Sequence, residues 1–153
     1  MITFDRVFEG IFVGTCPDNE RDLARLGRER ITAVLSLQSD ADLAERQIDW
    51  ADQEQAYQQL NITSYRVPII DFDDADMTAL LPGAAEVLEL LMKSNSRVYV
   101  HCSAGQQRSP SVVIGYLAWH RKLDLEEAIS LVMSARKCAP PLHVIRALDA
   151  ARD

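Results

Sequence analysis

The sequence predicts a single α/β domain whose central sheet is mostly parallel and carries helices on both faces. Short β-branched apolar runs, typical of buried strands, alternate with longer segments whose apolar residues recur with the helical period. This alternation favours parallel strands joined by helical crossovers. The 153 residues are 48% apolar, which suits one sizeable core. No linker or repeat divides the chain, so residues 1–153 are expected to form one domain.

Four segments are predicted to be strands. Each is short, rich in Val, Ile, Thr or Tyr, and bounded by polar or turn-forming residues. They lie near 10–14, over 31–37, over 62–69 and over 97–102. The runs 31–37 and 97–102 are almost continuously apolar, so we expect both to be buried. Pro68 ends the strand at 62–69, because proline cannot donate to a strand ladder.

Helices are predicted between and after these strands. The expected ranges are 18–28, 49–60, 78–93, 109–121, a segment that begins at Asp124 and 140–151. Asn95 closes the helix at 78–93. Ser109 and Pro110 resemble an N-cap followed by proline at the first helical position. Asp124-x-x-Glu127 has the spacing of a capping box. The polar segments "SDADL" and "IDFDDAD" are expected to be loops.

Composition narrows the classes of partner and location. The net charge of −7, with no evident basic face, disfavours nucleic acid and anionic membranes as partners. The acidic N-terminus has no long apolar core of the kind found in signal peptides, and no apolar run reaches the ~18 residues of a membrane span. A cytoplasmic protein is therefore expected. Three irregularly spaced cysteines indicate neither a disulfide framework nor a metal site, and no cofactor is expected.

The segment "HCSAGQQR" places a cysteine where a buried strand ends and a helix is about to begin. Ligands bind at the carboxyl ends of strands in open α/β sheets. After Cys102, the small residues Ala104 and Gly105 leave room for backbone N–H groups to turn inward, and glycine adopts positive φ readily. Inward N–H groups beside a helix N-terminus form an anion site and stabilise a thiolate. Cys102 is therefore the predicted nucleophile.

The neighbours of Cys102 fit phosphoryl transfer. Arg108 can hold two phosphoryl oxygens in a bidentate fork, which lysine cannot supply. Ser109 can donate a hydrogen bond to the cysteine sulfur and ease release of the thiolate. His101 is expected to hydrogen-bond to the loop backbone and support its shape.

Phosphoryl transfer from an ester also needs an acid that protonates the leaving oxygen. An acidic cluster between the strand at 62–69 and the next helix supplies the candidates. Asp71 comes first after the strand and is the predicted general acid, which would later activate water. Asp73 is the alternative.

The segment "VHCSAGQQRS" resembles the H-C-x5-R-S/T motif of cysteine-based phosphatases. The "VPIID" segment and "YLAWHRKLDLEEAISLVMSARK" resemble the dual-specificity branch of that family. The resemblance implies the dual-specificity phosphatase fold, a phosphocysteine intermediate and no metal. It also implies a phosphate-binding loop made of Ser103, Ala104, Gly105, Gln106 and Gln107. The short chain implies a shallow pocket that admits phosphoserine, phosphothreonine and phosphotyrosine in proteins.

A second likeness suggests another substrate. "LQSDADL", "IDFD" and "RKCAPPLHVIRAL" resemble the glucan phosphatases of the laforin and plant starch-phosphatase type. Phe72 is then a candidate for contact with the substrate. Glu45, Arg46 and Ala139 stand where those enzymes carry aromatic residues that stack on sugar rings. Phosphoproteins are therefore the expected substrates, and phosphoglucan is the alternative.

Two other classes of function are compatible with a cysteine in an anion loop. One is rhodanese-like sulfur transfer or arsenate reduction, although sulfur transfer needs no separate proton donor. The other is a catalytically silent module that binds phosphoproteins, against which the intact set of Cys102, Arg108 and Asp71 argues. The sequence leaves the oligomeric state open.

Overall fold

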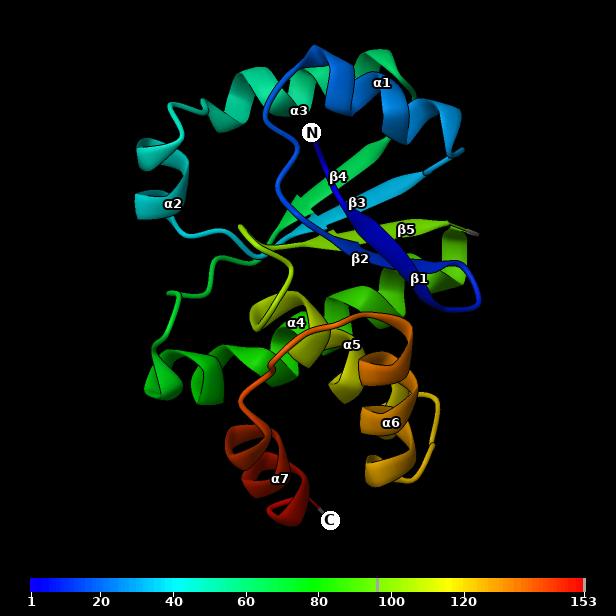
Figure 1. The fold of residues 1–153 in the computed structure, drawn as a ribbon, viewed down its shortest axis with the longest axis vertical. Coiled ribbons are helices and arrows are strands. Elements are labelled where there is room, and N and C mark those ends of the chain that lie inside the picture. The colour runs from blue at the N-terminus through cyan, green and yellow to red at the C-terminus, as the bar shows by residue number, and fades with distance from the viewer. Residues whose placement is uncertain (96, 153) are drawn as a thin grey trace.

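The computed structural model describes residues 1–95 and 97–152 and contains one sheet enclosed by helices (Figure 1). Five strands form the sheet. They are β1 (Phe4–Phe8), β2 (Ile11–Gly14), β3 (Ala33–Ser36), β4 (Thr63–Arg66) and β5 (Val98–His101). The order across the sheet is β1-β2-β5-β3-β4, so the last strand in the sequence lies at the centre.

The sheet is mostly parallel, as the sequence predicts. β5 runs parallel to β2 and to β3, and β3 runs parallel to β4, whereas β1 pairs with β2 in the antiparallel sense. The register places His101 opposite Gly14 on one side and Ser36 on the other. Three parallel strands therefore end side by side, and the segments that leave them meet at one edge of the sheet.

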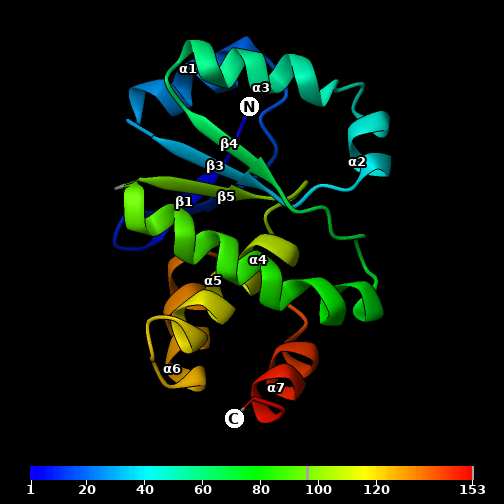
Figure 2. The same cartoon turned by 180° about the vertical axis from the view of Figure 1, so that it is seen from behind.

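Seven helices surround the sheet within the described residues. They are α1 (Glu20–Arg28), α2 (Asp40–Glu45), α3 (Trp50–Gln59), α4 (Asp74–Ser94), α5 (Arg108–Trp119), α6 (Leu125–Ala135) and α7 (Leu142–Ala150). Helices α1 and α3 cover one face of the sheet, and α4, α5, α6 and α7 lie on the other (Figures 1 and 2). This arrangement confirms the predicted α/β class. None of these helices combines the length and the apolar character needed to cross a membrane.

The side chains of the central strand alternate between two cores, as the two-residue period of a strand requires. Val98 and Val100 belong to the larger cluster, which also contains the buried faces of α4 and α5. Tyr99 points to the smaller cluster, where Leu26 of α1 and Tyr57 of α3 are fully buried. Because β5 is buried on both faces, its continuous apolar sequence is required rather than the alternating pattern of a half-exposed strand.

Several elements differ from the sequence prediction. Helix α4 begins at Asp74 instead of residue 78, because Asp73 caps it, so the end of the segment "IDFDDAD", expected to be a loop, is helical. Strand β4 ends at Arg66, before Pro68, instead of extending to residue 69.

Residues 4–8 form β1, which the sequence analysis did not predict, and Gly10 supports the turn into β2 with a φ of +70°. The segment "SDADL", expected to be a loop, forms most of α2. Its polar residues are helical because Ser39 and Asp42 make a reciprocal capping box with each other's backbone N–H.

Helix α5 also begins earlier than predicted. Its N-cap is Gln107 and its first residue is Arg108, so Ser109 and Pro110 lie inside the first turn instead of preceding it. Proline is tolerated there because the first N–H groups of a helix have no partner within the helix. The earlier start brings the arginine and serine of the motif onto the rigid end of a helix. Both of these side chains are buried.

Candidate active site

The predicted catalytic residues gather at the edge of the sheet where the parallel strands end. Cys102 directly follows β5, and Leu37 and Gln38 directly follow β3. A hydrogen bond of 2.9 Å from Leu37 N to the His101 carbonyl extends the contact between these strands to the edge. The chain that leaves β4 reaches Asp71. Three segments far apart in the sequence are thus brought together with α5.

Every backbone carbonyl from Cys102 to Gln107 accepts a hydrogen bond from a group outside the loop 102–108. The donors, in order of the carbonyl, are His101 Nδ1 at 3.1 Å, Cys16 N at 3.1 Å, Arg136 Nη2 at 3.3 Å, Arg136 Nε at 2.8 Å, Ala139 N at 2.9 Å, and Ser111 through N at 3.1 Å and Oγ at 2.6 Å. The Cys102 carbonyl oxygen can only accept a hydrogen bond. The His101 ring must therefore carry a hydrogen on Nδ1 and donate it. These contacts fix the direction of six consecutive peptide groups.

The orientation of the carbonyls determines the orientation of the amides. In a trans peptide the C=O of one residue and the N–H of the next point in opposite directions. The N–H groups of residues 103–108 therefore point away from the donors that hold the carbonyls. Within residues 1–95 and 97–152, none of these six N–H groups donates to a protein acceptor. Successive unpaired N–H groups at the start of the 12-residue helix α5 provide the chemistry of an anion site.

Gly105 lets the loop turn at its midpoint. Its φ is +66°, in the left-handed region that glycine adopts with little cost. A Cβ at this position would lie 2.7 Å from the Gly14 carbonyl oxygen and 2.7 Å from Arg136 Nη2. Both the conformation and the close approach of the β2 end require glycine here.

The four residues predicted to be catalytic form two linked pairs. Cys102 Sγ lies 3.2 Å from Ser109 Oγ, and Arg108 Nε lies 3.3 Å from Asp71 Oδ1. Arg108 and Ser109 are adjacent on α5, so the pairs are neighbours. The Arg108–Asp71 contact lacks hydrogen-bond geometry, and the Nε–H has no acceptor among the described residues. Cys102 and Arg108 expose 2% and 1% of their surface, whereas the Asp71 side chain is 32% exposed.

The four aspartates between β4 and the first turn of α4, at positions 71, 73, 74 and 76, differ in their hydrogen-bond partners. Asp73 caps α4 by accepting from the Asp76 N–H at 2.9 Å, and Asp76 accepts from Ile70 N at 2.7 Å. Asp74 pairs with His143 Nε2 at 2.6 Å. Asp71 is the member of this cluster whose carboxylate faces the arginine of the loop. The two candidates for the general acid therefore differ: Asp73 is committed to a helix end, and Asp71 is not.

The remaining predicted residues occupy distinct positions around the loop. Ser103 accepts a hydrogen bond from Gln38 Nε2 through its hydroxyl at 3.1 Å, and Gln106 donates from its side chain to the Lys137 carbonyl at 3.2 Å. Ala104 is exposed and Gln107 is half-buried. Phe72 is 80% exposed and has a φ of +57°. The left-handed turn at Phe72 directs a large apolar ring to solvent next to Asp71.

The sequence analysis missed Arg136, which makes two contacts with the loop 102–108 and one with β1. It donates to the carbonyls of Ala104 and Gly105 and pairs with Asp5 of β1 at 3.0 Å. The side chain is buried, and its planar guanidinium can donate in several directions at once. No local signal at residue 136 indicates these contacts, because their partners are 31 and 131 residues away.

A chain of hydrogen bonds from Cys16 through Gln38 to Ser103 also supports the loop, and the sequence analysis did not predict it. The Cys16 thiol donates to Gln38 Oε1 at 3.1 Å, and Gln38 Nε2 donates to the Ser103 hydroxyl. Burial, with Asp18 nearby, raises the pKa of Cys16 to about 12, so this thiol keeps its proton and can act as donor. The signal in the sequence was a glutamine directly after a buried strand.

Asp42 is a further residue at the site that the sequence analysis did not single out. Its carboxylate accepts from Arg108 Nη1 at 2.5 Å. The spacing Ser39-x-x-Asp42 is a capping-box signal that could have located the helix, though not the contact with Arg108.

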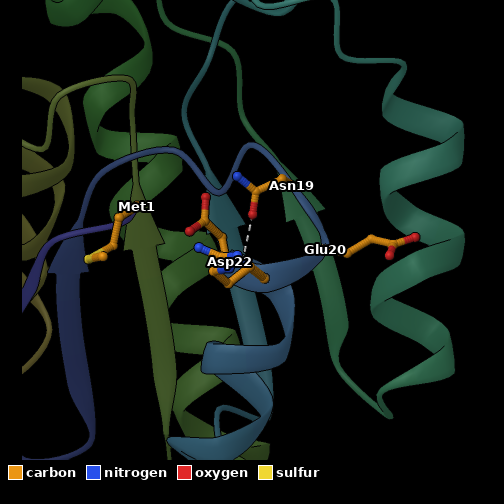
Figure 3. A pocket seen from close by; sticks show the side chains of 5 residues that line it. Met1, Asn19, Glu20 and Asp22 are labelled. Carbon is orange, nitrogen blue, oxygen red and sulfur yellow. Dashed lines mark hydrogen bonds between the residues drawn. The ribbon is translucent and has the colours of Figure 1, made fainter.

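Other features of the surface lie apart from these residues. A pocket of about 550 Å³ at the start of α1 is lined by Met1, Asn19, Glu20, Arg21 and Asp22 (Figure 3). The Asn19 side chain accepts from Asp22 N and caps the helix, as the dashed line in Figure 3 shows. Among the described residues, no hydrogen bond joins the five residues of this pocket to the loop 102–108. In the described part of the chain, no group of three or more His, Cys, Asp or Glu is arranged to hold a metal ion.

The fold and the site define a class of protein: an α/β domain with a thiol at the base of an amide-lined anion loop that an arginine closes. The chain matches the family described as "Dual specificity phosphatase, catalytic domain" over residues 11–152. It therefore belongs to the dual-specificity phosphatase family, and the resemblance that the sequence indicated is confirmed.

Relatives of two kinds resemble the chain. Phosphoglucan phosphatase LSF1 of Arabidopsis thaliana is 34% identical over 137 residues, which cover 90% of this chain and 23% of the relative. Phosphoglucan phosphatase DSP4 of Castanea sativa is 31% identical over 97% of this chain and 40% of its own length. Human dual specificity protein phosphatase 26 is 31% identical over 94% of this chain and 64% of its own length. The chain thus spans less than two thirds of each relative.

Solved structures support the fold. The crystal structure of Tk-PTP in the active form superimposes with a TM-score of 0.79 at 23% identity and covers 97% of both chains. The structure of PTPMT1 gives a TM-score of 0.77 at 19% identity, over 97% of this chain and 92% of that one. The arrangement of sheet and helices described above is therefore that of known phosphatase structures.

Gly105→Ala should destabilise the protein. The left-handed backbone alone costs a side chain about 1–2 kcal/mol, and the new Cβ would also crowd the Gly14 carbonyl. Urea unfolding of the two proteins measures the loss. Gly83→Ala in α4 is the matched control, because a Cβ there meets nothing within 4 Å and alanine favours the helix by roughly 0.5–1 kcal/mol. Equal effects of the two substitutions would refute the special role of Gly105.

His101 should make stability depend on pH. Complete burial lowers the pKa of His101 to about 4, whereas an unfolded histidine titrates near 6.5. Between these values the unfolded chain binds a proton that the native protein does not, so unfolding becomes easier as the pH falls. The loss amounts to about 3 kcal/mol from pH 7.5 to pH 4. The measurement is urea unfolding of the wild type and His101→Asn at several pH values; parallel curves would contradict the expectation.

Proposed function

We propose that this chain hydrolyses phosphate monoesters through a phosphocysteine intermediate. The observation that supports this proposal best is the loop 102–108, in which the six successive N–H groups after Cys102 donate to no acceptor among the described residues. Amides held in place beforehand stabilise charge on phosphoryl oxygens without reorganising during the reaction. Membership of the dual-specificity phosphatase family supports the same activity.

In the first step, the Cys102 thiolate attacks phosphorus and the bond between phosphorus and the ester oxygen breaks. The amides of 103–108 and the free edge of Arg108 hold the three other phosphoryl oxygens. Asp71 gives its proton to the departing oxygen, so the alcohol or phenol leaves neutral. The products are the free alcohol or phenol and phosphocysteine. The 3.3 Å between Asp71 Oδ1 and Arg108 Nε supports this assignment, because the proposed acid lies close to the arginine that we propose binds the phosphoryl group.

In the second step, Asp71 accepts a proton from water while the water oxygen attacks phosphorus. The sulfur–phosphorus bond breaks, and inorganic phosphate and the Cys102 thiolate are released. Ser109, 3.2 Å from the sulfur, stabilises the departing thiolate by donating its hydroxyl proton in a hydrogen bond. His101 keeps the loop in shape through the Cys102 carbonyl.

The substrates that we propose first are proteins that carry phosphotyrosine, phosphoserine or phosphothreonine. The short chain and the 32% exposure of the Asp71 side chain support this choice, because we expect a shallow approach to admit all three phosphorylated side chains. Phosphoglucan is the second candidate. Two relatives are named as phosphoglucan phosphatases, and the exposed ring of Phe72 beside Asp71 offers an apolar face on which a sugar can stack.

Substitution of the two principal residues should separate their roles. Cys102→Ser should abolish turnover and keep oxyanion binding. Asp71→Asn should slow hydrolysis of phenyl phosphate by about 10²–10⁴-fold, because phenoxide is a poor leaving group that needs protonation. Hydrolysis of 4-nitrophenyl phosphate should slow far less, because 4-nitrophenoxide leaves readily without a proton. Steady-state kinetics on both esters provide the measurement.

Asp73→Asn is the matched control for the acid, because asparagine also caps a helix and only the carboxyl group is lost. This variant should keep the wild-type ratio of rates on the two esters. A leaving-group effect in Asp73→Asn but not in Asp71→Asn would transfer the acid role to Asp73.

A substrate panel should distinguish the two proposed substrate classes. Phosphate release is measured from phosphotyrosine and phosphothreonine peptides, phosphoinositides and phosphorylated amylopectin. We expect the highest kcat/KM on phosphopeptides. A higher rate on amylopectin, reduced by Phe72→Ala but not by Ile70→Ala, which also removes an exposed apolar side chain, would favour the glucan assignment.

A further inference from the structure

One nitrogen of the Arg108 guanidinium is fully occupied by the protein. Nη1 lies 2.5 Å from Asp42 Oδ2, 2.9 Å from the Ile69 carbonyl and 3.4 Å from the Leu37 carbonyl. Two hydrogens on this nitrogen thus serve three acceptors. The hydrogens of Nε and Nη2 remain, on the edge of the guanidinium that faces Asp71. A substrate can therefore be held bidentately by this edge and not by Nη1.

The Asp42 carboxylate is itself held in place. It is the third residue of α2, and its Oδ2 also accepts from Ser39 N at 2.9 Å in the capping box. Its side chain is 13% exposed. Burial raises the pKa of Asp42, but the hydrogen bonds from Arg108 and Ser39 outweigh burial and leave that pKa below its usual value. A fixed, ionised oxygen therefore meets the guanidinium.

We propose that Asp42 is a positioning residue that acts through Arg108: it holds Nη1 so that the Nε and Nη2 edge is presented to the phosphoryl oxygens. This inference rests on the proposed function. Asp42 has a different relation to Arg108 from that of Asp71, which lies on the opposite, substrate-binding edge and is more exposed. The carbonyls of Leu37 and Ile69 assist, but they carry no charge and cannot align a cation as strongly.

Orientation of the guanidinium matters more in the transition state than in the ground state. The phosphoryl oxygens spread into one plane during in-line transfer, and a bidentate fork must match that geometry to stabilise it. A misplaced group can lower the rate about 100-fold. Inorganic phosphate, which is tetrahedral, depends less on the fork because the six loop amides also bind it.

Asp42→Asn tests this idea because it removes the charge and keeps the shape and the acceptor oxygen. We expect kcat on 4-nitrophenyl phosphate to fall by about 10- to 100-fold. The inhibition constant of orthovanadate, whose five-coordinate adduct with a thiolate resembles the transition state, should rise by a similar factor. The inhibition constant of inorganic phosphate should change by less than about threefold.

Asp40→Asn on the same helix is the matched control. It makes the same change in charge at a side chain that is 93% exposed and pairs with Arg66 instead of Arg108. This control should keep kcat and both inhibition constants within about threefold of the wild type, because it leaves the contact with Nη1 intact.

The outcomes separate the inference from the proposed function. A wild-type protein that hydrolyses no aryl phosphate overturns both. If the wild type is active and Asp42→Asn behaves like Asp40→Asn, only the positioning role is overturned. The same conclusion follows if Asp42→Asn changes the inhibition constants of vanadate and phosphate by equal factors. If Asp42→Asn does not fold, Asp42→Glu replaces it, since it keeps the charge and displaces it by one methylene. A lower kcat with unchanged phosphate inhibition then supports the role, and an unchanged kcat refutes it.

Discussion

The direction of six peptide groups is the constraint on which this site depends. The loop 102–108 can offer its amides to an anion only while its carbonyls are held on the other side, and the donors that hold them come from the ends of β2 and β5, from α5 and from the segment after α6. The motif supplies the proposed nucleophile Cys102 and the proposed phosphate ligand Arg108, but other parts of the fold supply the loop conformation. The anion site is thus a property of the whole domain rather than of eight residues.

Two carboxylates share one guanidinium, and their surroundings give them different capacities. Asp42 is almost buried, carries a second hydrogen bond from Ser39 and faces Nη1. Asp71 is more exposed, lies on the Nε side and makes no hydrogen bond to the arginine there. Burial raises the pKa of Asp42, but the hydrogen bonds from Arg108 and Ser39 outweigh it and hold that pKa below its usual value. Burial and hydrogen bonding thus distinguish two side chains of the same type at one arginine.

Most of the fold could be predicted from local patterns, because buried strands and amphipathic helices have distinct periods. The strands at 31–37 and 97–102, the helix before Asn95 and the family were confirmed. The helix α2 was missed because its polar residues have no apolar stripe and depend on a capping box. The contacts of Arg136 could not be predicted, because a single sequence does not indicate which distant carbonyls will come within reach of a side chain. The motif predicted which residues would meet, and tertiary structure determined how each is held.

The hydrogen bonds of Arg136 and Ala139 have a consequence for biosynthesis. Three of the six loop carbonyls receive their donors from residues near the C-terminal end of the described chain. A ribosome-bound chain that has emerged only as far as α5 already contains the cysteine and the arginine of the motif, but it lacks these donors. Such a nascent fragment lacks half of the donors that orient the loop carbonyls, so we expect the loop to take its final conformation only after residue 139 has emerged from the ribosome.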